Sequence, residues 1–138
     1  MRGRGTCPVS LDLHVRGQRF RDRPAPALSL ENDGYYWFLQ PLFARLRDEC
    51  GKSLDLYGDT QFTRDDFPRL RAVLTEAERL ARRQPRTWEV HLGTQLRPAK
   101  RELRRTVDRD RLLELIAAFR ALVDSADELG GTLECIGD

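Results

Sequence analysis

The sequence predicts an α+β protein: a two-layer α/β sandwich in which a mixed or antiparallel sheet of five to six strands carries three helices on one face. Three long stretches have the apolar spacing of amphipathic helices, and short segments that alternate apolar and polar residues separate them. Alternation indicates strands that are buried on one face only, which favours this architecture over a doubly wound parallel sheet. The expected element order is ββαβαββαβ.

The chain has 138 residues, the size of one domain, and we expect a single α/β domain over residues 9–138 after a disordered N-terminus at residues 1–8. Hydrophobic residues make up 40% and charged residues 33%, and no apolar run approaches the roughly 20 residues of a membrane helix. The basic N-terminus lacks the apolar stretch of a secretory signal. We therefore expect a cytoplasmic location and no membrane contact.

Two strands are expected first, over residues 9–16 and 27–31, with an arginine- and proline-rich loop between them. A helix over residues 34–50 follows, with Asp33 as its N-cap and Gly51 as its stop. Pro41 interrupts this helix, so the sequence leaves open whether it is continuous; the unbroken apolar stripe favours one bent helix.

Residues 53–57 alternate like a short strand, and Gly58-Asp59 ends it. Thr63 then begins a second helix, because its hydroxyl can cap the first turn and an apolar face runs on to Leu80 and Ala81. Gln84-Pro85 terminates this helix.

A hairpin is expected from strands over residues 87–93 and 102–107. The third helix begins at Asp108 or Asp110 and ends at Gly130-Gly131. A final strand covers residues 132–136.

Charge and cysteine content argue for no particular chemistry. The net charge of +2 is too small to imply a polyanionic partner by itself, and the arginine-rich 97–111 segment, with Arg104 and Arg105, is more typical of solvated surface than of a nucleic-acid site. The three cysteines show no metal-ligand or disulfide spacing, and Cys50 and Cys135 occupy apolar positions. We expect structural thiols and no cofactor.

Two groups of polar residues are candidate sites. Six acidic residues and histidines fall at polar positions of the expected strands: His14, His91, Glu89, Asp12, Asp55 and Glu134. They could form an acid and imidazole cluster on the open face of the sheet. Ordinary solvent-facing residues are the commoner explanation. Asp59 and Asp138 each follow a strand in a Gly-Asp pair. If those strands were parallel neighbours, the two carboxylates would meet and could bind a metal, but turn chemistry alone also explains both pairs.

The nine residues from Tyr35 to Phe43 contain five of the eleven aromatic residues. On a helix, Tyr35 and Phe43 fall in the core and Tyr36 on the flank, whereas Trp37 points away from the apolar stripe. Either the N-terminal hairpin covers Trp37, or Trp37 and Tyr36 contribute to a binding surface.

Four runs carry a resemblance: Asp33-Gly34-Tyr35-Tyr36-Trp37-Phe38-Leu39, Leu54-Asp55-Leu56-Tyr57-Gly58-Asp59, Trp88-Glu89-Val90-His91-Leu92-Gly93-Thr94 and Cys135-Ile136-Gly137-Asp138. Over residues 27–138 the chain resembles a group of small uncharacterised bacterial α/β proteins, some of which are immunity proteins encoded beside toxins. The resemblance implies a protein partner and supplies no catalytic residue. The slightly basic charge departs from that of an inhibitor that mimics nucleic acid.

The sequence does not decide whether the chain is an enzyme, and it favours a non-enzymatic, cytoplasmic protein-binding domain, such as an immunity or antitoxin-like factor. One alternative is a small metal-dependent hydrolase that uses the acidic residues at strand ends. The other is nucleic-acid binding through the 97–111 segment.

Overall fold

The computed structural model of the protein describes residues 10–17, 27–95 and 101–137, and of residues 91–95 and 101–105 it describes the backbone alone. Within these ranges the chain is α+β, with three helices and six strands in two antiparallel sheets. The elements in order are β1 (Ser10–Arg16), β2 (Ala27–Glu31), α1 (Gly34–Cys50), β3 (Asp59–Phe62), the short 3₁₀ helix η2 (Arg64–Asp66), α2 (Phe67–Arg82), β4 (Thr87–Gln95), β5 (Arg101–Asp108), α3 (Arg109–Glu128) and β6 (Thr132–Gly137).

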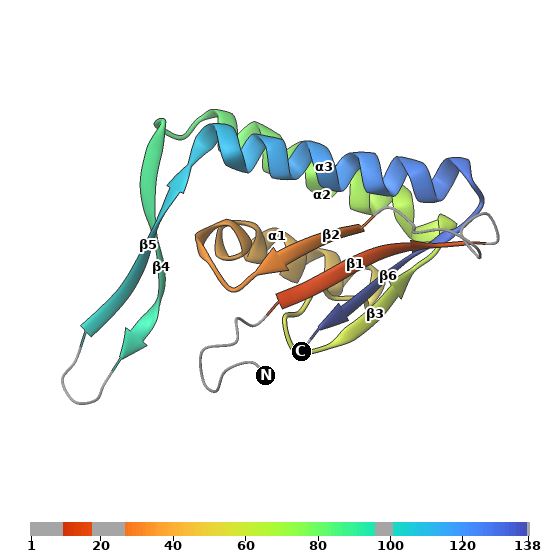
Figure 1. The fold of residues 1–138 in the computed structure, drawn as a ribbon, viewed down its shortest axis with the longest axis horizontal. Helices are drawn as coiled ribbons and strands as arrows, with labels where there is room; N and C mark the ends of the chain where they lie inside the picture. The colour runs from red at the N-terminus through yellow and green to blue at the C-terminus, as the bar shows by residue number, and fades with distance from the viewer. Residues whose placement is uncertain (1–9, 18–26, 96–100, 138) are drawn as a thin grey trace.

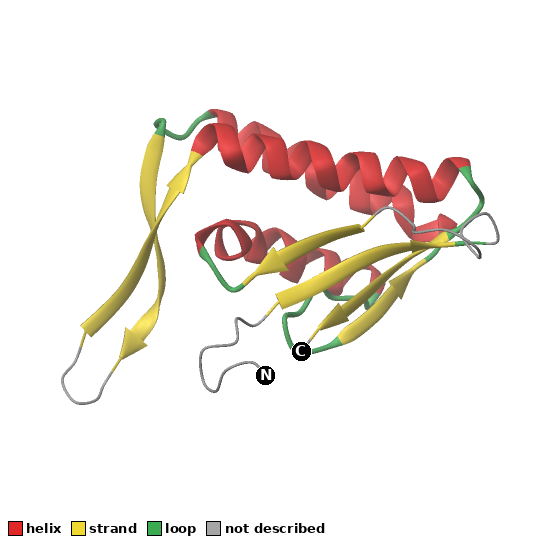
Figure 2. Ribbon diagram, in the orientation of Figure 1, coloured by secondary structure: helices red, strands yellow, loops and turns green. Residues whose placement is uncertain are grey.

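The larger sheet has the strand order β2-β1-β6-β3, and every neighbouring pair is antiparallel. Leu11, Leu13 and Val15 of β1 are buried and alternate with partly exposed polar residues, so one face of the sheet packs on the helices. Figure 1 shows α2 and α3 running side by side along this layer, and Figure 2 shows the same division into strands and helices. No helix of the described ranges covers the other face (Figure 1), where the polar residues of β1 are partly exposed, and we call it the open face.

The expected hairpin is confirmed, but its strands do not join the larger sheet. β4 and β5 pair with each other, Trp88 opposite Val107, and form a separate two-stranded sheet that projects from the body of the protein (Figure 1). Its base is anchored on α1, where the Trp88 and Phe38 rings meet edge-on with centroids 5.5 Å apart. The single sheet of five to six strands is therefore replaced by sheets of four and two strands.

Helix α1 agrees with its sequence signals and is continuous through Pro41. The Asp33 carboxylate accepts hydrogen bonds from the amides of Tyr35 (3.0 Å) and Tyr36 (3.1 Å), which caps the first turn. Gly51 ends the helix with a φ of 77°, a conformation that favours glycine.

The strand expected at residues 53–57 is absent, because this segment is a loop that ends in a turn. Leu54 and Leu56 are both buried, which produces an alternating pattern without any strand pairing. The strand begins only at Asp59, and it brings Phe62 into the core. No helix in the described ranges has the length and apolar character needed to cross a membrane.

Candidate functional site

The open face of the larger sheet is lined by polar side chains that bond to one another across the strands. Ser29 donates to Asp12 (2.9 Å), Arg16 pairs with Glu134 (2.7 Å), and Gln61 donates to Thr132 (3.1 Å). Exposed pairs of this kind contribute little stability, about 0–1 kcal/mol each. The described side chains on this face are mainly polar, and these three pairs link all four strands of the sheet.

The residues of the candidate acid and imidazole cluster lie in two different sheets. His14 lies on the open face opposite Glu134, whereas Glu89 and His91 belong to β4 in the projecting hairpin. Figure 1 shows the hairpin and β3 on opposite sides of the molecule. Asp55 lies in a turn, and among the described residues no three potential ligands gather to hold a metal ion. The His91 side chain lies outside the described residues.

The Gly-Asp pairs do not have the parallel arrangement that a shared metal site would require. β3 and β6 are antiparallel, with Asp59 opposite Ile136. The pair Gly58-Asp59 stands at the start of β3, and not at the end of a strand. The Asp59 carboxylate accepts a hydrogen bond from the Gly137 amide (3.0 Å), so it joins the two strands. Asp138 lies outside the described residues.

The most exposed large apolar side chain in the described part of the chain is Tyr57, at 66%. It stands on a tight turn from Asp55 to Gly58, in which the Gly58 amide donates to the Asp55 carbonyl (3.2 Å) and the Tyr57 amide donates to the Asp55 carboxylate (2.9 Å). The turn is joined to β6, since the Gly137 amide also donates to the Gly58 carbonyl (3.0 Å). The backbone therefore holds Tyr57 outward.

Tyr57 borders a pocket of about 150 Å³ between this loop and the outer side of α1. Trp37 and Arg47 of α1 line the same pocket. Trp37 is partly buried, and its indole N–H donates to the Asn32 side chain (2.6 Å), so it forms a fixed wall of the pocket. Ile136, 39% exposed, lies beyond the turn on the open face, opposite Asp59.

Tyr36 belongs to the core and not to the flank of α1, which corrects the sequence-based assignment. It is 4% exposed, and its hydroxyl donates to the Leu54 carbonyl (2.7 Å). Burial, together with the negative charge of Asp55, raises the pKa of Tyr36 to about 12 despite an opposing hydrogen bond with the backbone of Leu56. Tyr35, expected in the core, is partly exposed, and its hydroxyl accepts from the Asp108 amide (3.1 Å).

Tyr57 is not among the site residues predicted from the sequence, because residues 53–57 were expected to form a strand. A turn signal was present: aspartate at the first position of a β-turn and glycine at the fourth, as in Asp55-Leu56-Tyr57-Gly58, is the preferred composition of a type I turn. That signal would have put Tyr57 at a turn tip, where a tyrosine side chain is exposed.

Arg104 and Arg105 lie on β5, opposite His91 and Val90 respectively, and their side chains are outside the described residues. Cys135 is fully buried and Cys50 partly buried, and both are free. Burial, with a smaller contribution from Glu134, raises the pKa of the Cys135 thiol to about 12. Cys135 is thus an unreactive core residue.

Comparison of the chain with known protein families, curated proteins and solved structures found no match. The resemblance to immunity-type proteins remains a prediction.

Proposed function

We propose that the protein is a non-enzymatic protein-binding domain and that its contact surface consists of Tyr57, Trp37, Arg47 and Ile136, which we name the Tyr57 surface. The observation that carries the proposal is the 66% exposure of a tyrosine on a turn whose backbone is bonded at both ends. An aromatic side chain on an ordered backbone can be buried by a partner with little loss of conformational entropy.

The composition of this surface supports the same conclusion. Tyrosine, tryptophan and arginine are the residues most enriched among binding hot spots, and here residues of all three types border a single pocket. Trp37 is held by its bond to Asn32, and the T-shaped contact between its ring and Tyr36, with centroids 5.2 Å apart, joins it to the core. A partner side chain could therefore insert between Trp37 and Tyr57 without rearranging α1.

The proposed partner is another protein. The sequence resemblance to immunity-type proteins favours a bacterial toxin as that partner. In this role the domain would act by occupying the partner's surface, with no catalytic group of its own.

Site-specific crosslinking tests the proposal. A photoreactive phenylalanine analogue at position 57 should crosslink one protein in the source cells in high yield. The same analogue at position 118, an exposed site on α3, serves as the matched control and should not crosslink that protein. Equal crosslinking from both positions, or none from position 57, would contradict the proposal.

One observation favours a second candidate, nucleic-acid binding. Arg101, Arg104 and Arg105 lie on β5, in a two-stranded ribbon that projects from the body (Figure 1), and a two-stranded β-ribbon fits the major groove of DNA. If this candidate holds, duplex DNA or RNA should bind at about 50 mM salt and weaken steeply by about 200 mM. An Arg104→Gln, Arg105→Gln double variant should then bind more weakly. Absence of binding at low salt would eliminate this candidate.

A further inference from the structure

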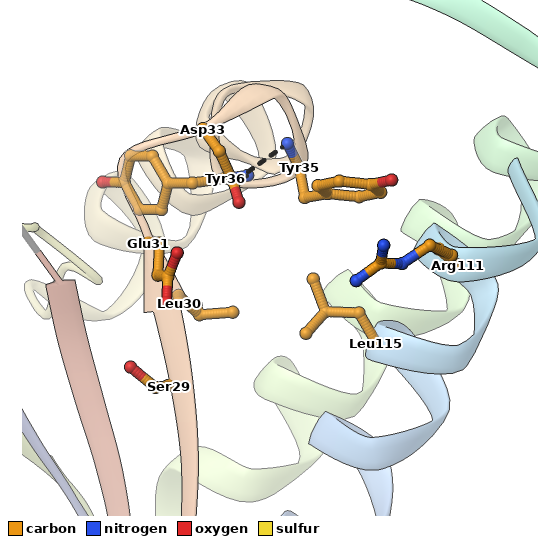
Figure 3. Close-up of a pocket in the computed structure, with 8 residues that line it drawn as sticks. All are labelled: Ser29, Leu30, Glu31, Asp33, Tyr35, Tyr36, Arg111 and Leu115. Carbon is orange, nitrogen blue, oxygen red and sulfur yellow. Dashed lines mark hydrogen bonds between the residues drawn. The ribbon is translucent and has the colours of Figure 1, made fainter. Parts of the chain in front are cut away.

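A second pocket, of about 230 Å³, lies along the outer edge of β2 and is closed on its far side by α3. Figure 3 shows Leu30 pointing from β2 toward Leu115 of α3, with the Tyr35 ring above them and the Arg111 side chain extending from α3 into the space between. Leu30 and Leu115 thus provide an apolar floor, and Arg111 provides a positive charge at the wall.

The β2 edge is available for pairing. Within the described ranges β2 pairs on one side only, with β1, so its other side presents backbone N–H and C=O groups. Natural edge strands are commonly blunted by lysine, proline or a β-bulge. β2 has no lysine, proline or bulge: its sequence is Ala-Leu-Ser-Leu-Glu, in which the terminal Glu31 is the one charged residue, and its register with β1 is regular.

Arg111 is held in place and, in the part of the chain that the structure describes, has no acidic partner. Its guanidinium carbon lies 6.0 Å from the centre of the Tyr35 ring, at the distance of a cation–π contact. The Tyr35 hydroxyl is itself fixed by the Asp108 amide. Two acidic residues line the pocket, and neither forms an ion pair with Arg111: the Asp33 carboxylate is bonded to the amides of α1, and Glu31 lies on β2 across the pocket from Arg111 (Figure 3).

We propose that this pocket binds an extended peptide segment of a partner protein, which adds as a strand to the free edge of β2 and places an acidic side chain against Arg111. Main-chain hydrogen bonds would provide affinity, and the pocket would provide specificity, as in other cases of strand addition. Every second side chain of an added strand points toward the helices. The acidic residue should therefore have apolar residues two positions away on either side, to cover Leu30 and Leu115.

This inference goes beyond the proposed function and does not depend on it. The β2 edge pocket lies beside Tyr35, whereas the Tyr57 surface lies beside Trp37, and the only residue that lines both pockets is the buried Tyr36. A variant at Tyr57 and a variant at Arg111 therefore test separate surfaces.

The probe is the fluorescein-labelled peptide Thr-Val-Thr-Glu-Thr-Val-Thr-amide, whose Val, Glu and Val residues share one face. We expect saturable binding by fluorescence anisotropy, with shifts of the backbone amide resonances of residues 27–31. Replacing the peptide Glu with Gln should weaken binding by about tenfold, because a charge-assisted bond to Arg111 is lost. N-methylation of alternate peptide amides should abolish binding, because it removes the main-chain donors.

Two protein variants complete the test. Arg111→Gln should weaken binding of the Glu peptide by about tenfold and should leave the already weaker binding of the Gln peptide unchanged. This pattern would identify Arg111 as the partner of the peptide Glu. Arg64→Gln removes the same charge from an exposed position outside the pocket and should change neither affinity. No saturable binding, an equal loss in both variants, or binding that survives N-methylation would overturn the proposal. So would a dimer through β2 that excludes the peptide.

Discussion

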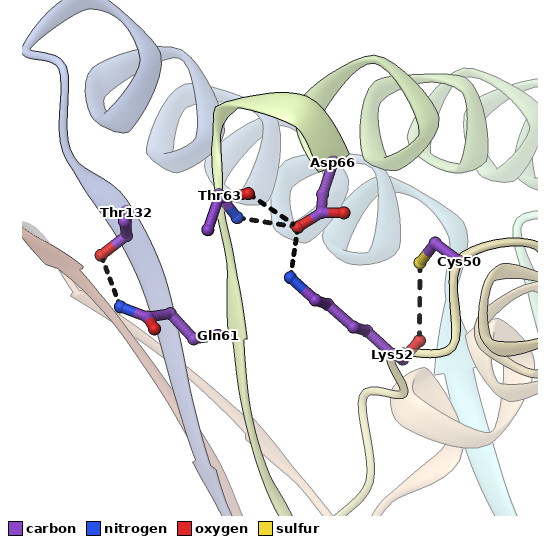
Figure 4. Close-up of polar contacts among 6 residues, drawn as sticks. All are labelled: Cys50, Lys52, Gln61, Thr63, Asp66 and Thr132. Atoms are coloured by element: carbon purple, nitrogen blue, oxygen red, sulfur yellow. Dashed lines mark hydrogen bonds and ion pairs between the residues drawn. The ribbon is translucent and has the colours of Figure 1, made fainter.

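The Asp66 carboxylate connects two separate parts of the chain, and its removal should lower the free energy of unfolding. It is the one charged side chain among the described residues that is buried, at 9% exposure. One oxygen accepts from the Lys52 ammonium (2.5 Å), the Thr63 amide (2.8 Å) and the Thr63 hydroxyl (3.2 Å), as Figure 4 shows. It thereby ties the loop after α1 to the start of α2.

The free-energy cost of Asp66→Ala follows from these bonds. Loss of the capping bond to the Thr63 amide costs about 1 kcal/mol. Loss of the charge-assisted bond to Lys52 costs about 1–2 kcal/mol, at the low end because about a third of the Lys52 side chain (32%) is exposed. The free energy of unfolding should fall by about 2–3 kcal/mol. For 138 residues the melting temperature should then fall by about 7–10 °C.

The contribution of Asp66 should also depend on pH. Burial alone would raise the pKa of Asp66, but the hydrogen bonds from Lys52 and Thr63 outweigh burial and lower the pKa below its ordinary 3.8. The folded state thus favours the charged form. The resulting stabilisation is fully present above the unfolded pKa and is lost as the pH falls through the folded pKa. The stability difference between wild type and Asp66→Asn should therefore shrink below pH 3.8.

Urea and thermal unfolding of purified variants measure both effects. Asp65→Ala, which removes an exposed neighbour from the same turn, is the matched control and should change stability by less than about 0.5 kcal/mol. If Asp66→Ala costs no more than Asp65→Ala, or if the Asp66→Asn difference is the same at neutral and acidic pH, the reasoning is refuted.

Three further predictions concern Gly137, the two described cysteines and Pro41. Gly137→Ala should lower the free energy of unfolding, measured in urea, by about 1–3 kcal/mol. A Cβ at this position would lie 2.6 Å from the Gly58 amide nitrogen and 2.7 Å from the Gly58 carbonyl oxygen. Unchanged stability would mean that the turn is not held against β6 as described. Alkylation of the folded protein at about pH 8 should modify Cys50 well before Cys135, because the buried Cys135 thiol has a pKa of about 12. Peptide mass spectrometry measures the two rates. Equal rates would contradict the burial of Cys135. Pro41→Ala should raise the free energy of unfolding by about 1 kcal/mol, as measured by thermal unfolding. The substitution restores an amide donor inside a continuous helix, at an exposed position. A lower free energy of unfolding would show that the proline ring is needed for packing.

The features that the sequence predicted correctly depend on local chemistry. Asp33 and Gly51 bound α1 through contacts within a few residues, and Asp108 caps α3 in the same way, so residue type at a fixed offset was sufficient. The hairpin was also predictable, since β4 and β5 are neighbours in the chain.

The features that were missed depend on contacts between distant residues. Alternation at Leu54 and Leu56 records which side chains are buried, and a loop laid over the core produces the same pattern as a strand. Tyr35 and Tyr36 both border the apolar side of α1. Tyr36 is the one in the core, where its hydroxyl donates a hydrogen bond to the Leu54 carbonyl, 18 residues away in the sequence. The division into two sheets likewise depends on strand pairing that one sequence does not contain.

If the Tyr57 surface binds a protein partner, as we propose, the affinity of the purified partner should differ between wild type and Tyr57→Ala. The dissociation constant should rise by about 30-fold or more, as expected for loss of a hot-spot tyrosine, while the unfolding midpoint should stay unchanged because the side chain is 66% exposed. Isothermal titration calorimetry gives the first quantity and urea unfolding the second. Unchanged affinity for a folded Tyr57→Ala protein would contradict the claim.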